Sequence, residues 1–359
     1  MSARPRALTP ASRKHAVRRG LHSGWGASRA GMIAPLQFFP TPLKTDFSAL
    51  WQLAPAPPDL WLLVGGGLAA ISTATAVTYL HPALRPQRRV QQAVQSWVPV
   101  ILLAALTLLL GTGLTWLVCA GTSLILLREG LRLLPLSPAE QRLHGGLAAL
   151  LSLAAHVLAA LGLMPWALGL CLVYSGLLLG PVQMLAGGPE RFITRVGGLM
   201  LVLNACVTLF LFVSLLVLQA PASRPLGGAG QGGFFFVLVI FSDAMQYVGG
   251  KCWGRHALAS SISPAKTWEG LAFAALICSG LGFALAPWLL GLPAWAGVLL
   301  ALAMVGLGLV GDLLVSCWKR DAGVKDTGTL LPGQGGALDR CDSLIFVAPW
   351  FWLLMQVSA

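Results

Sequence analysis

Charged side chains are scarce in this sequence. Asp, Glu, Lys and Arg make up only 10% of the 359 residues, whereas hydrophobic residues make up 56%. A soluble globular domain of this length needs a polar surface, so the composition excludes that class. Apolar runs close to the roughly 20 residues that cross a bilayer recur along most of the chain. The sequence therefore predicts an all-α, polytopic integral membrane protein, because helices satisfy their own backbone groups in lipid.

The seven cysteines lack the spacings that carry chemistry. None belongs to a CxxC pair or another metal-ligand pattern, and most lie in apolar runs. Cys317 and Cys341 lie in a charged segment near the C-terminus. We interpret all seven as small hydrophobic side chains rather than disulfides, metal ligands or redox groups.

We expect about nine or ten membrane-spanning helices. The predicted spans are residues 59–80, 98–127, 146–163, 165–186, 196–219, 232–250, 270–290, 294–316 and 344–358. The run 98–127 counts as two because Gly111–Gly113 can break it into a tight hairpin. Three regions follow: a basic N-terminal tail at 1–58, membrane helices over 59–230, and a C-terminal membrane region at 231–359. The last region has two polar loops and is expected to carry the catalytic residues.

The net charge of +12 is distributed as in a membrane protein. Basic residues gather in the tail and in alternate short loops rather than on one face with aromatics, which argues against nucleic-acid binding. The basic loops are 81–97, 128–145, 187–195, 250–268 and 317–343. The positive-inside bias places them all in the cytoplasm, so the two polar segments near the C-terminus share one face. The expected location is the bacterial inner membrane, with the site on its cytoplasmic face.

The N-terminal tail conflicts with this topology. It carries eight basic residues before position 45 and would lie on the opposite side of the membrane. We hypothesise that translation starts at Met32, which removes seven of these eight charges.

Two polar segments precede the most charged one. Asp243 lies within the apolar run 232–250, where a carboxylate needs a partner on a neighbouring helix or a polar cavity. Ser263-Pro264 predicts the start of a helix, with Ser as N-cap and Pro at the first helical position. Free amides there favour an anion, and Lys266 adds positive charge. The alternative is capping alone, with Lys266 extending to a lipid headgroup.

The segment 311–343 concentrates charge beside nearly pure hydrocarbon. It contains Asp312, Asp321, Asp326, Asp339, Asp342, Lys319, Arg320, Lys325 and Arg340. Charge beside a membrane span is costly and is rarely kept without a function. Asp339 and Asp342 are spaced i, i+3 and share a helix face, and carboxylates without His or Cys neighbours suit a hard cation such as Mg²⁺. The glycine-rich turn 332–336 offers amides to phosphate oxygens. These features favour phosphoryl or nucleotidyl transfer to a lipid; a solvated loop with ion pairs is the alternative.

A nearby glycine pattern imitates a nucleotide motif. Gly306, Gly308 and Gly311 fit GxGxxG, but they lie in an apolar helix without a βαβ unit. We interpret them as small residues that allow close helix packing.

The three polar segments resemble the phosphatidate cytidylyltransferases, also called CDP-diacylglycerol synthases. The residues that match the family signature are Ser316, Lys319, Arg320, Lys325, Asp326, Gly328, Pro332, Gly333, Gly335, Gly336, Asp339, Arg340 and Asp342. Residues 263–270 match the upstream motif SPxKTxEG, and Asp243, Tyr247, Gly250, Lys251, Gly254 and Arg255 match a third motif. Gln334 stands where the family usually has His, and its side chain forms hydrogen bonds without titrating near neutral pH.

The resemblance implies a reaction, its substrates and its site. CTP would transfer its cytidylyl group to phosphatidate, giving CDP-diacylglycerol and pyrophosphate in phospholipid biosynthesis. The implied catalytic residues are Asp312, Lys319, Arg320, Lys325, Asp326, Asp339, Arg340 and Asp342, with Asp312, Asp339 and Asp342 as Mg²⁺ ligands. The implied substrate-binding residues are Asp243, Ser263, Lys266, Thr267, Glu269, Gly333, Gln334, Gly335 and Gly336. A second cation and a homodimer are left open.

Two other classes of function compete with this one. A CTP-dependent lipid kinase of the polyprenol or phytol type would phosphorylate an alcohol and would need a base to activate it. A transporter would also explain intramembrane charge, but it should show repeated halves with broken helices near the midplane.

Overall fold

The computed structural model describes residues 111–221, 223–330 and 335–358, with the isolated positions 65, 102 and 109. Several predictions fall outside the described residues: the basic tail 1–58, the start at Met32, and nearly all of the predicted span 59–80 and of the part of the run 98–127 that precedes Gly111. Gly333 and Gln334 also lie outside them.

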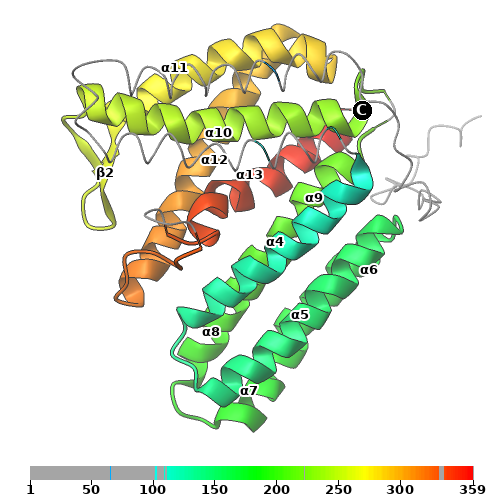
Figure 1. Ribbon diagram of the computed structural model, residues 1–359, viewed down its shortest axis with the longest axis vertical. Helices are drawn as coiled ribbons and strands as arrows, with labels where there is room; N and C mark the ends of the chain where they lie inside the picture. Colours follow the sequence, from blue (N-terminus) through cyan, green and yellow to red (C-terminus); the bar gives the residue numbers. More distant parts are fainter. Residues whose placement is uncertain are drawn as a thin grey trace, which may run out of the picture. The chain divides into compact units, whose positions relative to one another are not determined.

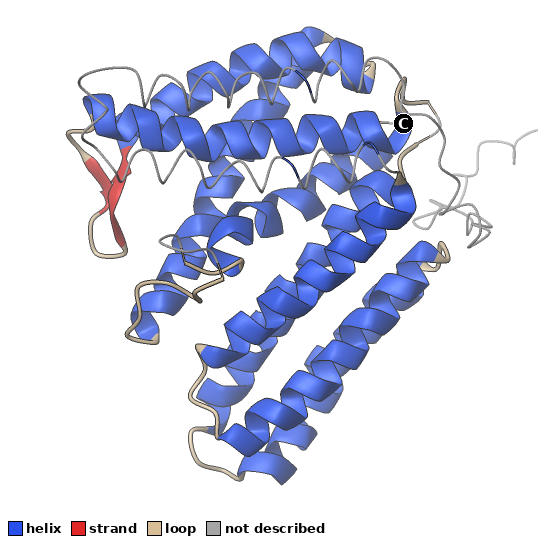
Figure 2. Cartoon of the chain, in the orientation of Figure 1, coloured by secondary structure: helices blue, strands red, loops and turns tan. Residues whose placement is uncertain are grey.

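Most described residues are helical (Figures 1 and 2). In chain order the elements are α4 (Thr112–Arg132), α5 (Pro138–Ala160), α6 (Met164–Val173), η2 (Tyr174–Leu178), α7 (Leu179–Gly187), α8 (Phe192–Leu203), η3 (Asn204–Leu209), α9 (Phe210–Leu218), α10 (Gly227–Trp253), β1 (Ala257–Ala259), β2 (Ser263–Thr267), α11 (Trp268–Leu285), η4 (Ala286–Leu290), α12 (Ala294–Asp321) and α13 (Leu338–Val357). The three η segments are π-helical turns that continue neighbouring helices.

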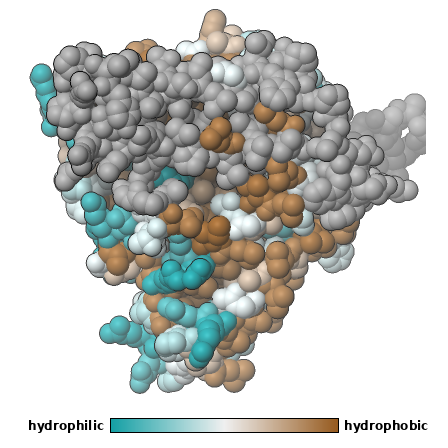
Figure 3. All heavy atoms as spheres, in the orientation of Figure 1, coloured by the Kyte–Doolittle hydropathy of each residue, from teal (hydrophilic) through white to brown (hydrophobic). Residues whose placement is uncertain are grey.

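Seven helical segments in the described chain are long and apolar enough to cross a membrane. They are Thr112–Arg132, Pro138–Ala160, Met164–Gly187, Phe192–Leu218, Gly227–Trp253, Trp268–Leu290 and Ala294–Asp321. Large apolar side chains such as Leu150, Leu185 and Ile193 are exposed on these segments or beside them, and Figure 3 shows such side chains over much of the visible described surface. The protein is thus a polytopic membrane protein, as predicted.

The predicted spans from 146–163 to 294–316 each fall on one of these segments, and the largest difference is at Pro138, where the helix begins before the predicted residue 146. The last predicted span, 344–358, lies in α13, which begins earlier and is not one of the seven. The predicted break at 111–113 is present, because Gly111 has φ +91° and α4 begins at Thr112. Only Gly readily adopts that backbone conformation.

The all-α prediction is wrong at one place. Residues 257–267 form a two-stranded antiparallel hairpin, β1 with β2, so Ser263-Pro264 does not start a helix. The N-cap of α11 is Thr267 instead, whose Oγ1 accepts a hydrogen bond from the amide of Gly270 (3.1 Å). Glu269 then accepts the amides of Arg255 and His256, which holds the start of the hairpin against the start of α11.

The C-terminal helices pack tightly around one another. α11 contacts both α10 and α12, while α13 contacts α12, α10 and α9 (Figure 1). The close approach of α12 to α13 depends on Gly311, because a Cβ there would collide with the carbonyl oxygen of Asp342. Gly308 faces Ser343, whereas Gly306 faces open space. The interpretation of the GxGxxG pattern as a packing feature is therefore confirmed for Gly311; a Cβ on Gly308 would make only ordinary contact with Ser343.

We expect Gly311→Ala to destabilise the protein. The added methyl group meets backbone, which cannot rotate away, and such overpacking costs about 1–3 kcal/mol. The measurement is the thermal unfolding midpoint of the full chain in detergent. Gly306→Ala in the same helix is the control and should leave the midpoint unchanged; an equal shift in both variants would contradict the packing role of Gly311.

Candidate active site

Three helices and the hairpin bring charged side chains of opposite sign together in a carboxylate cluster. It consists of Asp243 of α10, Asp312 of α12, Asp342 of α13 and Lys266 of β2. Lys266 forms an ion pair with Asp312, and its Nζ donates to Oε1 of Gln246 (3.3 Å). Burial lowers the pKa of Lys266, but Asp312, Asp243 and Asp342 raise it. The net pKa of Lys266 is above the usual value. The Lys266 side chain is therefore held as the charged ammonium.

Hydrogen bonds from Ser343 fix the carboxylates of Asp243 and Asp342. Ser343 Oγ lies 3.0 Å from each carboxylate oxygen of Asp243, and the Ser343 amide donates to Oδ1 of Asp342 (2.8 Å). Asp342 is buried, with 5% of its surface exposed, whereas the side chains of Lys266 and Asp312 are each 20% exposed. The carboxylate cluster is thus reachable from the side of Lys266 and Asp312.

The donor set of this cluster suits a hard divalent cation. It offers carboxylate oxygens without thiols or imidazoles, which is the ligand type that Mg²⁺ prefers. Its three carboxylates outnumber the cations that act on them, Lys266 and Arg340, so a divalent ion would offset the remaining negative charge. In the described residues, no three His, Cys, Asp or Glu side chains are close enough together to hold one ion. In the carboxylate cluster the positive charge beside the carboxylates is that of Lys266.

Asp339 belongs to a different network from the one predicted. Its Oδ1 pairs with Nζ of Lys319 (2.7 Å), and its Oδ2 accepts the amides of Thr327 (2.8 Å) and Gly336 (2.9 Å) and the hydroxyl of Thr327 (2.9 Å). Asp339 precedes Asp342 by three residues on the same helix face, as expected, but it lies in the first turn of α13, where unpaired amides favour a carboxylate. The structure therefore groups Asp312 and Asp342 with Asp243, not with Asp339.

The partners of Asp339 change the pKa of its carboxyl. Burial raises the pKa of its carboxyl. The hydrogen bonds from Lys319, Gly336 and Thr327 lower this pKa by more than burial raises it, so the net pKa is below the usual value. Asp339 is thus an ionised anchor for the loop between α12 and α13.

Glu129 of α4 is a second anchor for the same loop. It is buried, with 5% of its surface exposed. Its Oε1 accepts the amide of Ala337 (3.0 Å), and its Oε2 accepts the amide of Leu338 (2.8 Å) and the hydroxyl of Thr327 (3.1 Å). A carboxylate at these first amides stabilises the start of α13. Glu129 therefore links the N-terminal helices to the charged segment.

The sequence did not point to Glu129, because its partner Thr327 lies 198 residues away in the chain. One signal was present in the sequence: the residue is one of only 12 acids and lies at the end of an apolar run. Charge in such a place needs a partner.

The glycines of the loop allow both carboxylates to approach the backbone. Gly335 has φ +88°, and a Cβ there would collide with the carboxylate of Asp339. A Cβ on Gly336 would collide with the carboxylate of Glu129. The predicted phosphate contacts of these two glycines stay a prediction, and the Gly336 amide already donates to Asp339.

The other predicted site residues lie around these two networks. Arg320 donates from Nε to the carbonyl oxygen of Ile262 (3.3 Å), which connects the end of α12 to the hairpin. Lys325 and Asp326 are exposed in the loop, and Ser263 is half-buried in β2. Thr267 caps α11, and Glu269 holds the hairpin and contacts Nδ1 of His256 (2.6 Å). These last two have structural partners, so their contact with substrate stays a prediction.

The chain is similar to a known protein family and to several named proteins. The model of a family described as "Cytidylyltransferase family" matches residues 91–358, well over half of the chain. The chain is 36% identical over 181 residues to the uncharacterized protein YnbB of Escherichia coli, covering 50% of this chain and 60% of YnbB. It is 38% identical over 177 residues to a phosphatidate cytidylyltransferase of Mycobacterium leprae, covering 49% and 54%. A phosphatidate cytidylyltransferase of Haemophilus influenzae is 37% identical over 123 residues, with 33% and 43% covered. The aligned part thus spans about half the length of these relatives.

We expect Glu129→Gln to loosen the loop before α13. The substitution removes the charge from three hydrogen bonds, and a hydrogen bond to a charged group contributes about 1.5–3 kcal/mol. The thermal midpoint in detergent should fall, and limited proteolysis should cut the loop 323–337 faster. Glu190→Gln, at an exposed glutamate, is the control. Equal protease resistance in parent and Glu129→Gln would exclude the anchoring role.

Proposed function

Because the chain belongs to the cytidylyltransferase family, we propose that it transfers the cytidylyl group of CTP to phosphatidate, giving CDP-diacylglycerol and pyrophosphate. The observation that carries this proposal is the carboxylate cluster, in which helices of a membrane protein gather Asp243, Asp312 and Asp342 around Lys266. The similarity to enzymes named phosphatidate cytidylyltransferase supports the choice of lipid substrate.

The proposed reaction is a displacement at the α-phosphorus of CTP. A phosphate oxygen of phosphatidate forms the new P–O bond, and the bond from that phosphorus to the pyrophosphate breaks. A phosphate monoester with a second pKa of about 6 is largely dianionic at neutral pH, so the attacking oxygen needs little help from a base. The main obstacle is repulsion between two anions, which positive charge must offset.

The chain offers cations for both substrates. Lys266 lies in the carboxylate cluster, Lys319 and Arg340 lie on the helices beside it, and Arg320 and Lys325 are exposed near the loop. We assign these side chains to the phosphates of CTP and of the lipid. Asp312, Asp342 and Asp243 would hold Mg²⁺, whose charge would counter that of the phosphates. The positive charge of the basic loops supports a site on the cytoplasmic face of the membrane.

A direct assay tests the reaction. Full-length protein in detergent is incubated with CTP, Mg²⁺ and phosphatidate, and the lipid products are identified by mass. A CDP-lipid is the expected product. A phosphorylated lipid with CDP would identify a CTP-dependent lipid kinase instead, and the absence of any lipid product would overturn the proposal.

Substitution of the carboxylate cluster should abolish most of this activity. We expect Asp312→Asn and Asp342→Asn to lower kcat by at least about 100-fold, since each removes a charge that organises cation and phosphates. Asp321→Asn is the matched control, because Asp321 is exposed at the end of the same helix as Asp312. Full activity of Asp312→Asn, or an equal loss in Asp321→Asn, would contradict the assignment.

Metal titration distinguishes Asp339 from the cluster. EDTA should abolish product formation, and Mg²⁺ should restore it. Conservative Asp→Glu variants at 312 and 342 should need more Mg²⁺ for half-maximal activity, because the ligand positions shift. Asp339→Glu should instead lower the thermal midpoint while its Mg²⁺ requirement stays that of the parent. A raised Mg²⁺ requirement in the Asp339 variant would return Asp339 to the metal site.

A further inference from the structure

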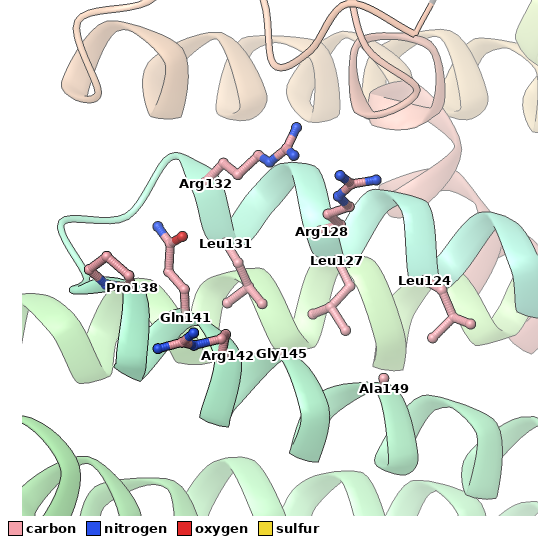
Figure 4. A pocket seen from close by; sticks show the side chains of 10 residues that line it. All are labelled: Leu124, Leu127, Arg128, Leu131, Arg132, Pro138, Gln141, Arg142, Gly145 and Ala149. Carbon is pink, nitrogen blue, oxygen red and sulfur yellow. The ribbon is translucent and has the colours of Figure 1, made fainter.

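The pocket between α4 and α5 does not gather charge, although its volume is about 530 Å³ (Figure 4). Arg128 and Arg132 of α4 point away from Arg142 of α5. Leu127 and Leu131, which also line this pocket, are only 2% and 5% exposed and already pack in the core. A ligand site is marked by polar groups that converge on one point rather than by volume alone. Such convergence is found in the carboxylate cluster, which a buried glutamine of α10 joins.

This glutamine, Gln246, is held between two partners. It is 5% exposed and lies one turn after Ser242 on α10. Its Nε2 donates to Oγ of Ser242 (3.1 Å), and its Oε1 accepts from Nζ of Lys266 (3.3 Å). An ammonium group can only donate hydrogen bonds, so the amide must face Lys266 with its oxygen. The buried hydroxyl of Ser242 then receives the amide nitrogen at the other end. The orientation of the Gln246 side chain is therefore fixed from both sides.

The backbone on both sides of this contact is held as well. A Cβ on Gly270, in the first turn of α11, would collide with the carbonyl oxygen of Gln246. Thr267, which follows Lys266 in β2, caps the same helix. The start of α11 thus keeps β2 against α10, which fixes the backbone position of Lys266. The lysine side chain has a flexible four-carbon stem, so the position of its ammonium depends on the partners of that group.

The two partners of the Lys266 ammonium differ in charge. Asp312 is a carboxylate that forms an ion pair with it, whereas the Gln246 amide is neutral. A neutral acceptor holds the ammonium without cancelling its charge. An ammonium has three N–H groups. In the part of the chain that the structure describes, Asp312 and Gln246 accept from two of them, which leaves the third for an oxygen of a bound phosphate.

We propose that Gln246 is a positioning residue for Lys266: it holds the ammonium beside Asp312 through a neutral hydrogen bond and so keeps its positive charge directed at a substrate phosphate. This inference rests on the proposed function, in which Lys266 binds such a phosphate. Gln246 itself lies outside the motif positions that match the family, although Asp243 and Tyr247 beside it do match. A carboxylate in its place would add negative charge next to the phosphates, and an apolar side chain would leave Lys266 with Asp312 alone among its two described acceptors.

The first measurement uses no substrate. The full chain in detergent is acylated at one fixed pH with an N-hydroxysuccinimide ester, and the modification of each lysine is quantified by mass spectrometry of its peptides. In Gln246→Met, Lys266 should react at least about threefold faster relative to the exposed Lys251, because one hydrogen bond to the ammonium is lost. Gln246→Glu keeps an acceptor oxygen and should leave the rate of Lys266 at or below that of the parent. Gln246→Ala serves if Gln246→Met is unstable.

Gln231→Met is the matched control for this measurement. Gln231 is a second buried glutamine on α10, and it lies roughly 22 Å along the helix from Gln246, at about 1.5 Å per residue. Its substitution should leave the labelling of Lys266 unchanged. An unchanged rate in Gln246→Met, or an equal increase in Gln231→Met, would overturn the positioning role. Because neither CTP nor phosphatidate is present, this result holds whether or not the chain makes a CDP-lipid.

The second measurement determines kcat and KM for CTP in the lipid assay. Gln246→Met should lower kcat/KM by at least about tenfold, because a displaced cation stabilises the transition state less. Gln246→Glu should lower it as well, although Lys266 stays held, because the added charge repels the phosphates. Gln231→Met should keep the kcat/KM of the parent. Full activity of Gln246→Met beside faster labelling of Lys266 would overturn the link to the phosphate, and full activity of Gln246→Glu would overturn the need for a neutral partner.

Discussion

An ionised side chain is stable in this apolar molecule only when a partner of opposite charge or several hydrogen bonds hold it. The pairing of Lys266 with Asp312 is the central case. It joins the hairpin to α12, and the same ammonium faces the carboxylates contributed by α10 and α13. Because each of these carboxylates needs this positive charge, the four elements are held in one arrangement. The geometry of the proposed active site follows from that arrangement.

A second set of buried interactions controls the loop that precedes α13. Asp339 holds this loop from within α13, and Glu129 holds it from α4. Thr327 donates its amide to Asp339 and its hydroxyl to Glu129, so the two anchors act on one point of the loop. α13 therefore carries one acid for the loop, Asp339, and one for the carboxylate cluster, Asp342. This division gives two acids three residues apart different physical roles.

The sequence predicts the membrane spans well, since long apolar runs have few other stable solutions in lipid. It also identifies Asp243, Lys266, Asp312 and Asp342, because each polar residue is conspicuous against hydrocarbon. It cannot predict their partners. The helical spacing of Asp339 and Asp342 suggested a shared ion; in the structure Asp339 instead accepts the loop amides of Thr327 and Gly336, and its role as a metal ligand stays a prediction. Ser263-Pro264 has the pattern of a helix start, yet pairing with β1 and the cap at Thr267 place the start four residues later. Glu129 depends on a contact across the fold, which no local pattern reveals.

The central claim is that the carboxylate cluster directs chemistry to the α-phosphorus of CTP. Its most direct test supplies the protein with phosphatidate, Mg²⁺ and CTP labelled with ³²P at either the α or the γ position. The account predicts that the α label enters the lipid fraction and that the γ label leaves in pyrophosphate. Transfer of the γ label to the lipid, with the α label retained in CDP, would contradict it.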